Sequence, residues 1–162
     1  MASEEKSINI HYKEISSISK LSEMDKRAMD MAISAADRAY APYSNFKVGA
    51  AIVMEGGLII TGSNQENAAY PSGLCAERVA VFSAASEYPN RLIEKIIVVA
   101  KSKNGEIVPV SPCGSCRQAL LEYEDKQSMP IIVTITYNNG SLIEFSSINS
   151  LLPFGFNRDQ IK

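Results

Sequence analysis

The sequence predicts an α/β protein with a three-layer α/β/α fold, in which helices cover both faces of a mixed five-stranded sheet. Three observations predict this class. Apolar runs of strand length alternate with helix-length segments along the chain. The pairs Gly56-Gly57 and Asn139-Gly140 each separate two strand-like runs, which is typical of antiparallel hairpins. Between these hairpins a strand, a helix and a strand follow in order, which implies a parallel pair with a right-handed crossover.

The first regular element is predicted to be a helix that stops before Pro42. Ser22, followed three residues later by Asp25, is typical of a helix N-cap. Methionine and alanine residues then recur at helical spacing from residue 24 to residue 39. The same criteria predict the remaining elements. In chain order these are strands at 47–54 and 58–62, a helix at 75–87, a strand at 95–101, a helix at 113–123, strands at 130–137 and 141–146, and a short helix near 148–152.

Length and composition fit one compact domain. The chain has 162 residues, of which 46% are hydrophobic, so its core is large enough to be stable alone. Residues 1–20 are mixed and polar with only a weak apolar pattern, and we interpret them as an N-terminal extension. We interpret residues 21–162 as a single domain, since no linker, repeat or low-complexity tract divides them.

The charge pattern argues against a nucleic-acid partner. The net charge is −2, and lysines and arginines are scattered among the acids instead of forming a basic stripe. The longest apolar runs, such as residues 96–100 and 131–135, are far shorter than a membrane span. The chain begins Met-Ala-Ser-Glu-Glu-Lys and reaches no apolar signal core, so we expect a cytoplasmic protein without membrane contact.

The numbers of cysteines and histidines limit the kinds of catalysis and metal binding that the chain can support. Three cysteines cannot all pair, and a reducing compartment leaves them as thiols, so metal binding and nucleophilic catalysis are the roles to weigh. The only histidine, His11, lies in the polar N-terminal segment. Serine or cysteine catalysis with a histidine base is therefore poorly supported.

The three cysteines lie in a pattern that predicts a catalytic zinc site. Cys75 opens one predicted helix, and the motif Pro-Cys-Gly-Ser-Cys at residues 112–116 opens another, about one strand later. The positive end of a helix favours thiolate over thiol, and thiolates suit zinc. Cys75, Cys113 and Cys116 would hold one Zn²⁺ per chain and leave the fourth tetrahedral position to water. The alternatives are ordinary buried thiols, or a structural site completed by another ligand.

Charged residues beside the cysteines predict the proton chemistry. Glu77 lies two residues after Cys75, so it can approach the water without binding the metal, and we interpret it as the general acid and base. Three thiolates on a divalent ion leave a net negative charge, which Arg78 would offset from outside the ligand set. Gln118 is a second candidate for that outer position. The alternatives are that Glu77 merely complements the helix dipole and that Arg78 is solvated.

The motif Cys-Ala-Glu, followed by Pro-Cys-x-x-Cys, is the signature of zinc nucleobase deaminases. From about Met24 to Phe156 the chain resembles the cytidine deaminases, specifically the small single-domain kind that forms homotetramers. The resemblance also rests on three further segments, which are Ala-Pro-Tyr-Ser-Asn-Phe at 41–46, Gly-Ser-Asn-Gln-Glu-Asn-Ala-Ala-Tyr-Pro at 62–71, and Leu-Leu-Pro at 151–153. It implies a cytidine-deaminase-like fold.

The resemblance implies roles for residues outside the metal motif. Asn64 and Glu66 would hydrogen-bond the ribose hydroxyls, and Phe46 would pack against the pyrimidine. The backbone N–H of Ala76 would meet the base carbonyl, and Phe156 would reach into a neighbouring subunit's active site. Taken alone, Asn64 is equally typical of a turn, Glu66 of a solvated acid and Phe46 of a core. Phe156 alone is typical of a hydrophobic tail anchor.

The reaction implied is zinc-dependent hydrolytic deamination of cytidine, and of 2′-deoxycytidine, to uridine or deoxyuridine with release of ammonia, in pyrimidine salvage. Gln65, where an apolar residue is usual, and Ala69, where serine is frequent, leave the fine substrate preference open. A blasticidin-type nucleoside antibiotic deaminase has the same motifs and is the alternative enzyme. A zinc-stabilised binding protein without turnover is the alternative of another class. A polynucleotide editor is disfavoured by the charge pattern.

Overall fold

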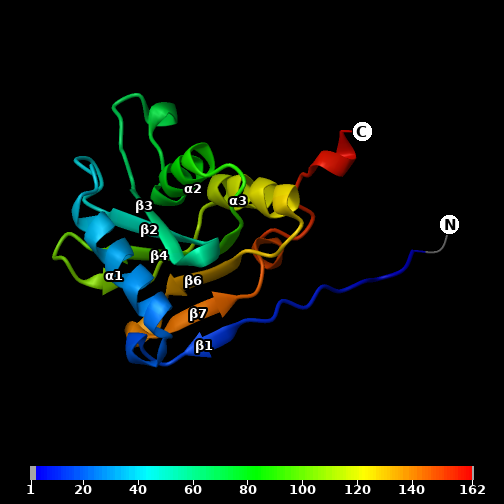
Figure 1. The fold of residues 1–162 in the computed structure, drawn as a ribbon, viewed down its shortest axis with the longest axis horizontal. Coiled ribbons are helices and arrows are strands. Elements are labelled where there is room, and N and C mark those ends of the chain that lie inside the picture. Colours follow the sequence, from blue (N-terminus) through cyan, green and yellow to red (C-terminus); the bar gives the residue numbers. More distant parts are fainter. Residues whose placement is uncertain (1–2, 162) are drawn as a thin grey trace.

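The structure, a computed structural model, describes residues 3–161 (Figure 1). Three α-helices and seven strands lie within these residues. The helices are α1 (Glu23–Asp37), α2 (Ala76–Glu87) and α3 (Gly114–Gln127). The strands are β1 (Lys13–Ile15), β2 (Lys47–Met54), β3 (Leu58–Ser63), β4 (Ile93–Lys101), β5 (Ile107–Val108), β6 (Ile132–Thr136) and β7 (Leu142–Phe145). This order of elements confirms the predicted α/β class.

The strands form one mixed sheet with the order β1-β7-β6-β4-β2-β3, and β5 pairs with β4. Neighbouring strands are antiparallel except β4 and β6, which are parallel. Helix α3 connects these two parallel strands, so the predicted parallel pair with a helical crossover is present.

The sheet has seven strands, whereas the sequence predicted five. The two additional strands, β1 and β5, contain three and two residues. Segments this short carry too little alternation of apolar and polar residues for a sequence pattern to detect. They form because the edge of β7 and the end of β4 offer unpaired backbone groups. Strand β1 belongs to the segment predicted as an extension, and Ile15 and Ile18 of that segment pack against the core.

Helices cover both faces of the sheet, as predicted. Helix α1 packs on one face, and α2 and α3 pack on the other (Figure 1). The central strand β4 supplies side chains to both cores, because successive side chains point to opposite faces. Ile97 packs in one cluster with Met29 of α1, whereas Ile96 packs in the other with Leu120 of α3. Burial on both faces explains why β4 contains an unbroken apolar run.

Two glycines allow helices to approach the sheet closely. A Cβ atom on Gly49 in β2 would clash with the carbonyl oxygen of Ala32 in α1. A Cβ atom on Gly62 in β3 would lie 2.5 Å from both the carbonyl oxygen of Ala76 and the backbone nitrogen of Ala80 in α2. Gly62 therefore holds the first turn of α2 directly against the end of β3.

Residues 3–12, here called the N-terminal arm, precede β1 and lead outward from the sheet (Figure 1), with the ring centroid of Tyr12 5.9 Å from that of Phe145. They are exposed to solvent along their whole length. Within residues 3–161, no helix combines the length and apolar character that crossing a membrane requires.

Candidate active site

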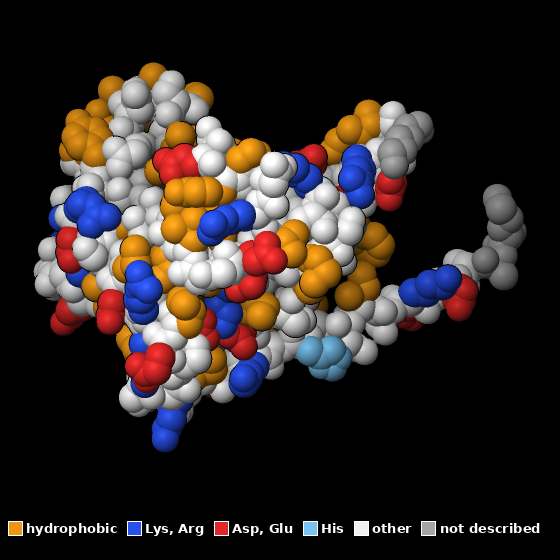
Figure 2. Space-filling model, viewed as in Figure 1, with side chains coloured by type: hydrophobic (Ala, Val, Ile, Leu, Met, Phe, Trp, Pro, Cys, Tyr) orange, Lys and Arg blue, Asp and Glu red, His pale blue; other side chains and the backbone are white. Residues whose placement is uncertain are grey.

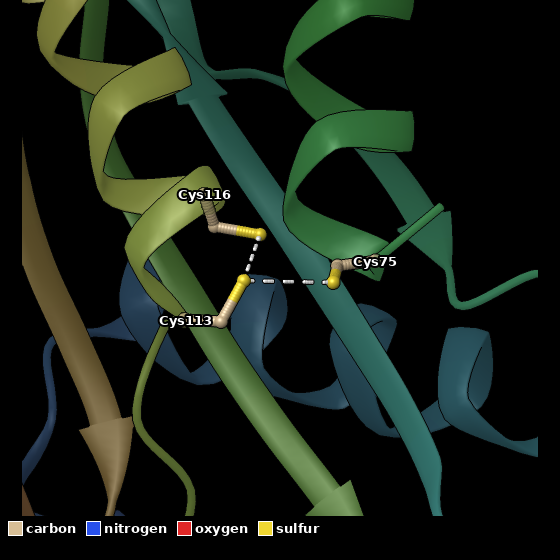
Figure 3. A group of neighbouring side chains, drawn as sticks. All are labelled: Cys75, Cys113 and Cys116. Atoms are coloured by element: carbon tan, nitrogen blue, oxygen red, sulfur yellow. Dashed lines mark hydrogen bonds between the residues drawn. The ribbon is translucent and has the colours of Figure 1, made fainter. Parts of the chain in front are cut away.

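Three cysteines meet where the N-termini of α2 and α3 face each other (Figure 3). Cys75 is the N-cap of α2, Cys113 is the N-cap of α3, and Cys116 lies in the first turn of α3. The Sγ atoms of Cys75 and Cys113 are 3.8 Å apart, and those of Cys113 and Cys116 are 3.5 Å apart. The positive ends of two helix dipoles therefore converge on three sulfurs, which favours their thiolate forms.

The spacing and chemistry of these sulfurs fit a zinc ion. Zinc bound tetrahedrally at a zinc–sulfur distance of about 2.3 Å separates its sulfur ligands by about 3.8 Å. All three sulfurs lie within 4.8 Å of one another, and all three cysteines are free thiols. Three protein ligands leave one tetrahedral position open, which is the arrangement of catalytic zinc sites.

Cys75 and Cys116 differ in acidity. A hydrogen bond from Cys116 and the neighbouring Arg78 guanidinium lower the pKa of Cys75 to about 5, although burial opposes this shift. Donation of that hydrogen bond to Cys75, together with burial, raises the pKa of Cys116. Without metal, Cys75 therefore becomes a thiolate more readily than Cys116 does.

Glu77 lies beside the cysteine cluster in the first turn of α2. Its side chain is buried, with 4% of its surface exposed. Burial is the main cause of a raised pKa for the Glu77 carboxyl, and the nearby Cys75 thiolate raises it further. A carboxyl whose pKa is raised toward neutrality can both accept and donate a proton, as a general acid and base must.

Arg78 brings positive charge to the cluster. Its guanidinium lowers the pKa of Cys75 and donates a hydrogen bond from Nη2 to the carbonyl oxygen of Gly73, at 3.5 Å. The Nε atom of Arg78 is buried and has no hydrogen-bond partner within the described residues. This arrangement lets Arg78 offset the negative charge of the three sulfurs.

An open pocket of about 510 Å³ adjoins the cluster on the α2 side. Its walls come from the loop before β2, the segment after β3 and the start of α2. The lining residues are Tyr43, Ser44, Asn64, Gln65, Glu66, Asn67, Tyr70, Gly73, Leu74, Cys75 and Arg78. Its volume fits a small polar molecule of nucleoside size.

Asn64 and Glu66 line this pocket and also hold the loop that precedes β2. The side chain of Asn64 accepts a hydrogen bond from the backbone of Val48 at 2.8 Å and donates one to the carbonyl oxygen of Phe46 at 3.0 Å. Glu66 accepts from the Ser44 hydroxyl and from the backbone N–H groups of Tyr43 and Ser44. The Ser44 hydroxyl is the main cause of the lowered pKa of Glu66.

The other predicted substrate residues lie in different surroundings. Phe46 is 40% exposed, so it is not a core residue, and Ala76 is fully buried at the first position of α2. Phe156 is 58% exposed and does not line the pocket of its own chain. Gln118 donates a hydrogen bond to the carbonyl oxygen of Phe156 at 2.7 Å, so it contacts the C-terminal segment.

Sequence reasoning assigned no role to three residues that shape the site. Gly62 sets the position of the first turn of α2, and its only sequence signal is its place at the end of a strand just before the pocket segment. Tyr43 and Tyr70 lie on the pocket wall with their ring centroids 6.3 Å apart. Both belong to segments with family resemblance, but exposed tyrosines carry no signal of their own.

This topology, with a three-thiolate site and a buried carboxyl at two facing helix N-termini, defines the class of zinc-dependent deaminases. The sequence model described as "Cytidine and deoxycytidylate deaminase zinc-binding region" matches residues 22–131. The chain belongs to this family, and the predicted zinc dependence is confirmed.

Similar proteins cover most of the chain. A cytidine deaminase of Sporosarcina psychrophila is 42% identical over 127 residues, which are 78% of this chain and 87% of that protein. The crystal structure of a cytidine deaminase from Burkholderia pseudomallei aligns with a TM-score of 0.69 and 38% identity, covering 81% of this chain and 98% of that one. That of Mycobacterium tuberculosis aligns with a TM-score of 0.63 and 31% identity, covering 81% and 95%.

Proposed function

We propose that this protein catalyses the hydrolytic deamination of cytidine and 2′-deoxycytidine to uridine and deoxyuridine, with release of ammonia. One observation supports the proposal most strongly: Cys75 lines an open pocket of about 510 Å³, its sulfur is one of three spaced for zinc, and the buried Glu77 follows it two residues later. The names of the similar proteins support cytidine as the substrate. As part of this proposal, the protein acts in pyrimidine salvage in the cytoplasm.

Cys75, Cys113 and Cys116 would hold the zinc ion. When bound, zinc supplies a Lewis acid that makes water nucleophilic near neutral pH. Glu77 takes a proton from that water as a C–O bond forms at C4 of the cytosine ring. Glu77 passes this proton to N3, then takes the remaining proton of the added hydroxyl and delivers it to the amino group, so that the C4 carbonyl forms, the C4–N bond breaks and ammonia leaves. The raised pKa of Glu77 matches this double role.

The pocket residues would orient the nucleoside. Asn64 and Glu66 would hydrogen-bond the sugar hydroxyls, because both line the pocket and each retains hydrogen-bonding capacity beyond the loop contacts described above. The exposed ring of Phe46 would pack on the pyrimidine, and the Ala76 N–H would meet the base carbonyl. Arg78 and Gln118 remain the candidates for support around the metal ligands.

We also propose that four chains assemble and share active sites. Phe154 and Phe156 are 92% and 58% exposed near the C-terminus, and single chains rarely leave neighbouring aromatic residues this exposed without a partner. Because Phe156 does not line the pocket of its own chain, it would complete the pocket of a neighbouring one.

The alternatives predict different substrates. A blasticidin-type deaminase would use the same sulfurs and glutamate on a nucleoside antibiotic, and a zinc-stabilised binding protein would turn nothing over. A polynucleotide substrate is disfavoured because basic and acidic side chains are interspersed on the face shown in Figure 2, with no continuous basic stripe there.

The decisive assay follows the ultraviolet absorbance of cytidine with and without a zinc chelator, together with metal analysis of the purified protein. The proposal predicts chelator-sensitive conversion to uridine and about one zinc per chain. Bound zinc without turnover of cytidine or deoxycytidine would favour the blasticidin-type deaminase. If the protein were also inactive on that antibiotic, the zinc-stabilised binding protein would be favoured.

A further inference from the structure

Arg117 follows the metal ligand Cys116 directly, and its guanidinium joins two segments that are distant in the sequence. Its Nε donates to the carbonyl oxygen of Pro112 at 2.8 Å, and its Nη2 donates to the hydroxyl of Ser111 at 3.0 Å. Its Nη1 donates to the carbonyl oxygen of Leu151 at 2.9 Å. One side chain therefore contacts both the loop before Cys113 and the C-terminal segment.

The loop is the immediate support of a metal ligand. Ser111 and Pro112 precede Cys113, whose extended backbone leads into α3. Pro112 is buried, so its carbonyl oxygen needs a partner, and Arg117 provides one. Loss of this contact would free the segment that sets the direction of the Cys113 side chain.

The C-terminal segment, residues 151–156, follows a 3₁₀ turn at Ile148–Leu151 and carries the exposed rings of Phe154 and Phe156. Two side chains on the first turns of α3 hold it: Arg117 binds the carbonyl of Leu151, and Gln118 binds that of Phe156. The segment therefore takes its position from the same helix that supplies Cys116.

We infer that Arg117 is a positioning residue that couples the geometry of the zinc ligands to the position of the C-terminal segment. The inference rests on the proposed role of Cys113 and Cys116 as zinc ligands. Arg117 touches neither substrate nor metal in this scheme. It fixes the loop before Cys113 relative to Leu151, so that movement at one end of the guanidinium is transmitted to the other.

Lysine cannot replace this contact. The planar guanidinium presents several N–H donors in a rigid fork, and three of its nitrogens each reach a separate acceptor here. A lysine ammonium would satisfy one of the two segments and leave the other without its partner.

The 3₁₀ turn at Ile148–Leu151 is also held by hydrogen bonds that do not involve Arg117. A substitution at Arg117 should therefore affect only the segments that Arg117 itself contacts. Glu124 is buried in α3 and accepts hydrogen bonds from the Ile148 backbone at 2.9 Å and from the Ser147 hydroxyl at 2.7 Å. Replacement of Arg117 should therefore loosen residues 151–156 and the loop before Cys113 while the turn itself stays attached.

The experiment compares Arg117→Lys with wild-type holoenzyme. We expect zinc release to a chromogenic chelator to become about tenfold faster, in line with the cost of losing outer support around metal ligands. Hydrogen exchange should accelerate both at 109–113 and at 151–156. With Co²⁺ in place of zinc, the visible absorption bands should change, because they report the geometry of the ligands.

Arg38→Lys is the matched control. Arg38 also bonds a carbonyl oxygen and a hydroxyl, both of Ser34, but it joins no second segment. It should leave zinc release, exchange and the cobalt spectrum unchanged.

Acceleration of exchange at only one of the two segments, or an unchanged cobalt spectrum, would overturn the coupling. The exchange measurement needs no turnover, so it can test the coupling even if the wild-type protein does not deaminate cytidine. An inactive wild type would count against the proposed substrate alone.

Discussion

Glu77 is the residue on which the proposed chemistry depends most directly. Substitution Glu77→Gln keeps the shape of the side chain but removes its ability to carry a proton. We expect zinc content to stay near that of the wild type and kcat for cytidine to fall by about 10²- to 10⁴-fold. Steady-state kinetics with parallel metal analysis measures both quantities.

Glu87→Gln is the control for this substitution, since Glu87 is an exposed acid at the last position of the same helix. It should leave kcat and zinc content unchanged. A kcat for Glu77→Gln within tenfold of the wild type would remove Glu77 from the proton pathway.

Lys95 forms a second cluster of charges, away from the cysteines. Its Nζ lies 2.9 Å from the Asp25 carboxylate in α1 and 3.0 Å from that of Glu144 in β7. Burial acts to lower the pKa of Lys95, but the hydrogen bonds to the two carboxylates outweigh it and raise the pKa. A pKa raised by folding stabilises the protein below the unfolded-state pKa of about 10.4, and that contribution is lost as pH rises through the folded-state value.

Lys95→Met should therefore destabilise the protein by about 1 to 3 kcal/mol at pH 8, because it removes the cation that two partly buried carboxylates share. The difference from wild type should shrink as the pH rises from the unfolded-state pKa of about 10.4 through the folded-state pKa of Lys95. Urea unfolding at pH 8 and pH 11 tests this, with the exposed Lys103→Met as control. A difference that stayed constant with pH would argue against the ion pairs.

At the level of elements, the close contact of α2 with β3 determines where Cys75 and Glu77 lie. Gly62→Ala places a methyl group against the backbone of Ala76 and Ala80, so the first turn of α2 must move away from β3. We expect a loss of about 1 to 3 kcal/mol in the free energy of unfolding. We also expect a fall in activity larger than this loss explains, because Cys75 and Glu77 move with the turn.

Gly49→Ala separates the two effects. It creates an equal or worse clash against Ala32 of α1, on the other face of the sheet. It should cost similar stability but leave the activity of the folded fraction intact. Equal loss of activity in both variants at a temperature where both are folded would mean that Gly62 has no special role in the site.

Strand β1 gives a prediction about the edge of the sheet. Deletion of residues 1–9 should leave the stability near that of the wild type, because residues 3–9 are exposed. Deletion of residues 1–16 removes the partner of β7 and the partly buried Ile15, and should cost about 2 kcal/mol. Urea unfolding and light scattering measure the loss and any edge-to-edge aggregation. Equal stability of the two truncated chains would contradict a structural role for β1.

The sequence predicts features that depend on neighbouring residues better than features that depend on contacts between distant segments. Helices α1, α2 and α3 and the two hairpins follow from periodicity, caps and turn residues, which are local properties. The cysteine cluster was also predictable, because helix N-termini after neighbouring strands place their first residues close together. The contact of Arg117 with Leu151 joins residues 34 positions apart and has no local signal. Strands β1 and β5 depend likewise on an edge supplied by the rest of the sheet.

For the whole molecule, the proposed assembly predicts both the mass in solution and a role for Phe156 in the active site of a neighbouring chain. Light scattering should give the mass of four chains. Phe156→Ala should raise KM for cytidine, since each site would lose an aromatic wall supplied by its neighbour, whereas Phe154→Ala is the matched exposed control. A monomeric mass with full activity would contradict shared sites.

A mixing experiment distinguishes sharing between chains from an effect within one chain. Mixed assemblies of Glu77→Gln and Phe156→Ala chains contain sites in which an intact Glu77 meets an intact Phe156 from the other chain. Activity should therefore recover after the two variants are dissociated and reassembled together. No recovery in assemblies shown to be mixed would place both residues in the site of the same chain.

The separation of the zinc ligands in the sequence affects how the protein is made. Cys75 leaves the ribosome 38 residues before Cys113, and β4 lies between them. The three sulfurs meet only after α2 and α3 have both docked on the same face of the sheet. Metal capture by the complete site is therefore a late step of biogenesis, and the nascent chain must carry reduced thiols until then. The need for a reducing environment is greatest during synthesis, before zinc protects the sulfurs.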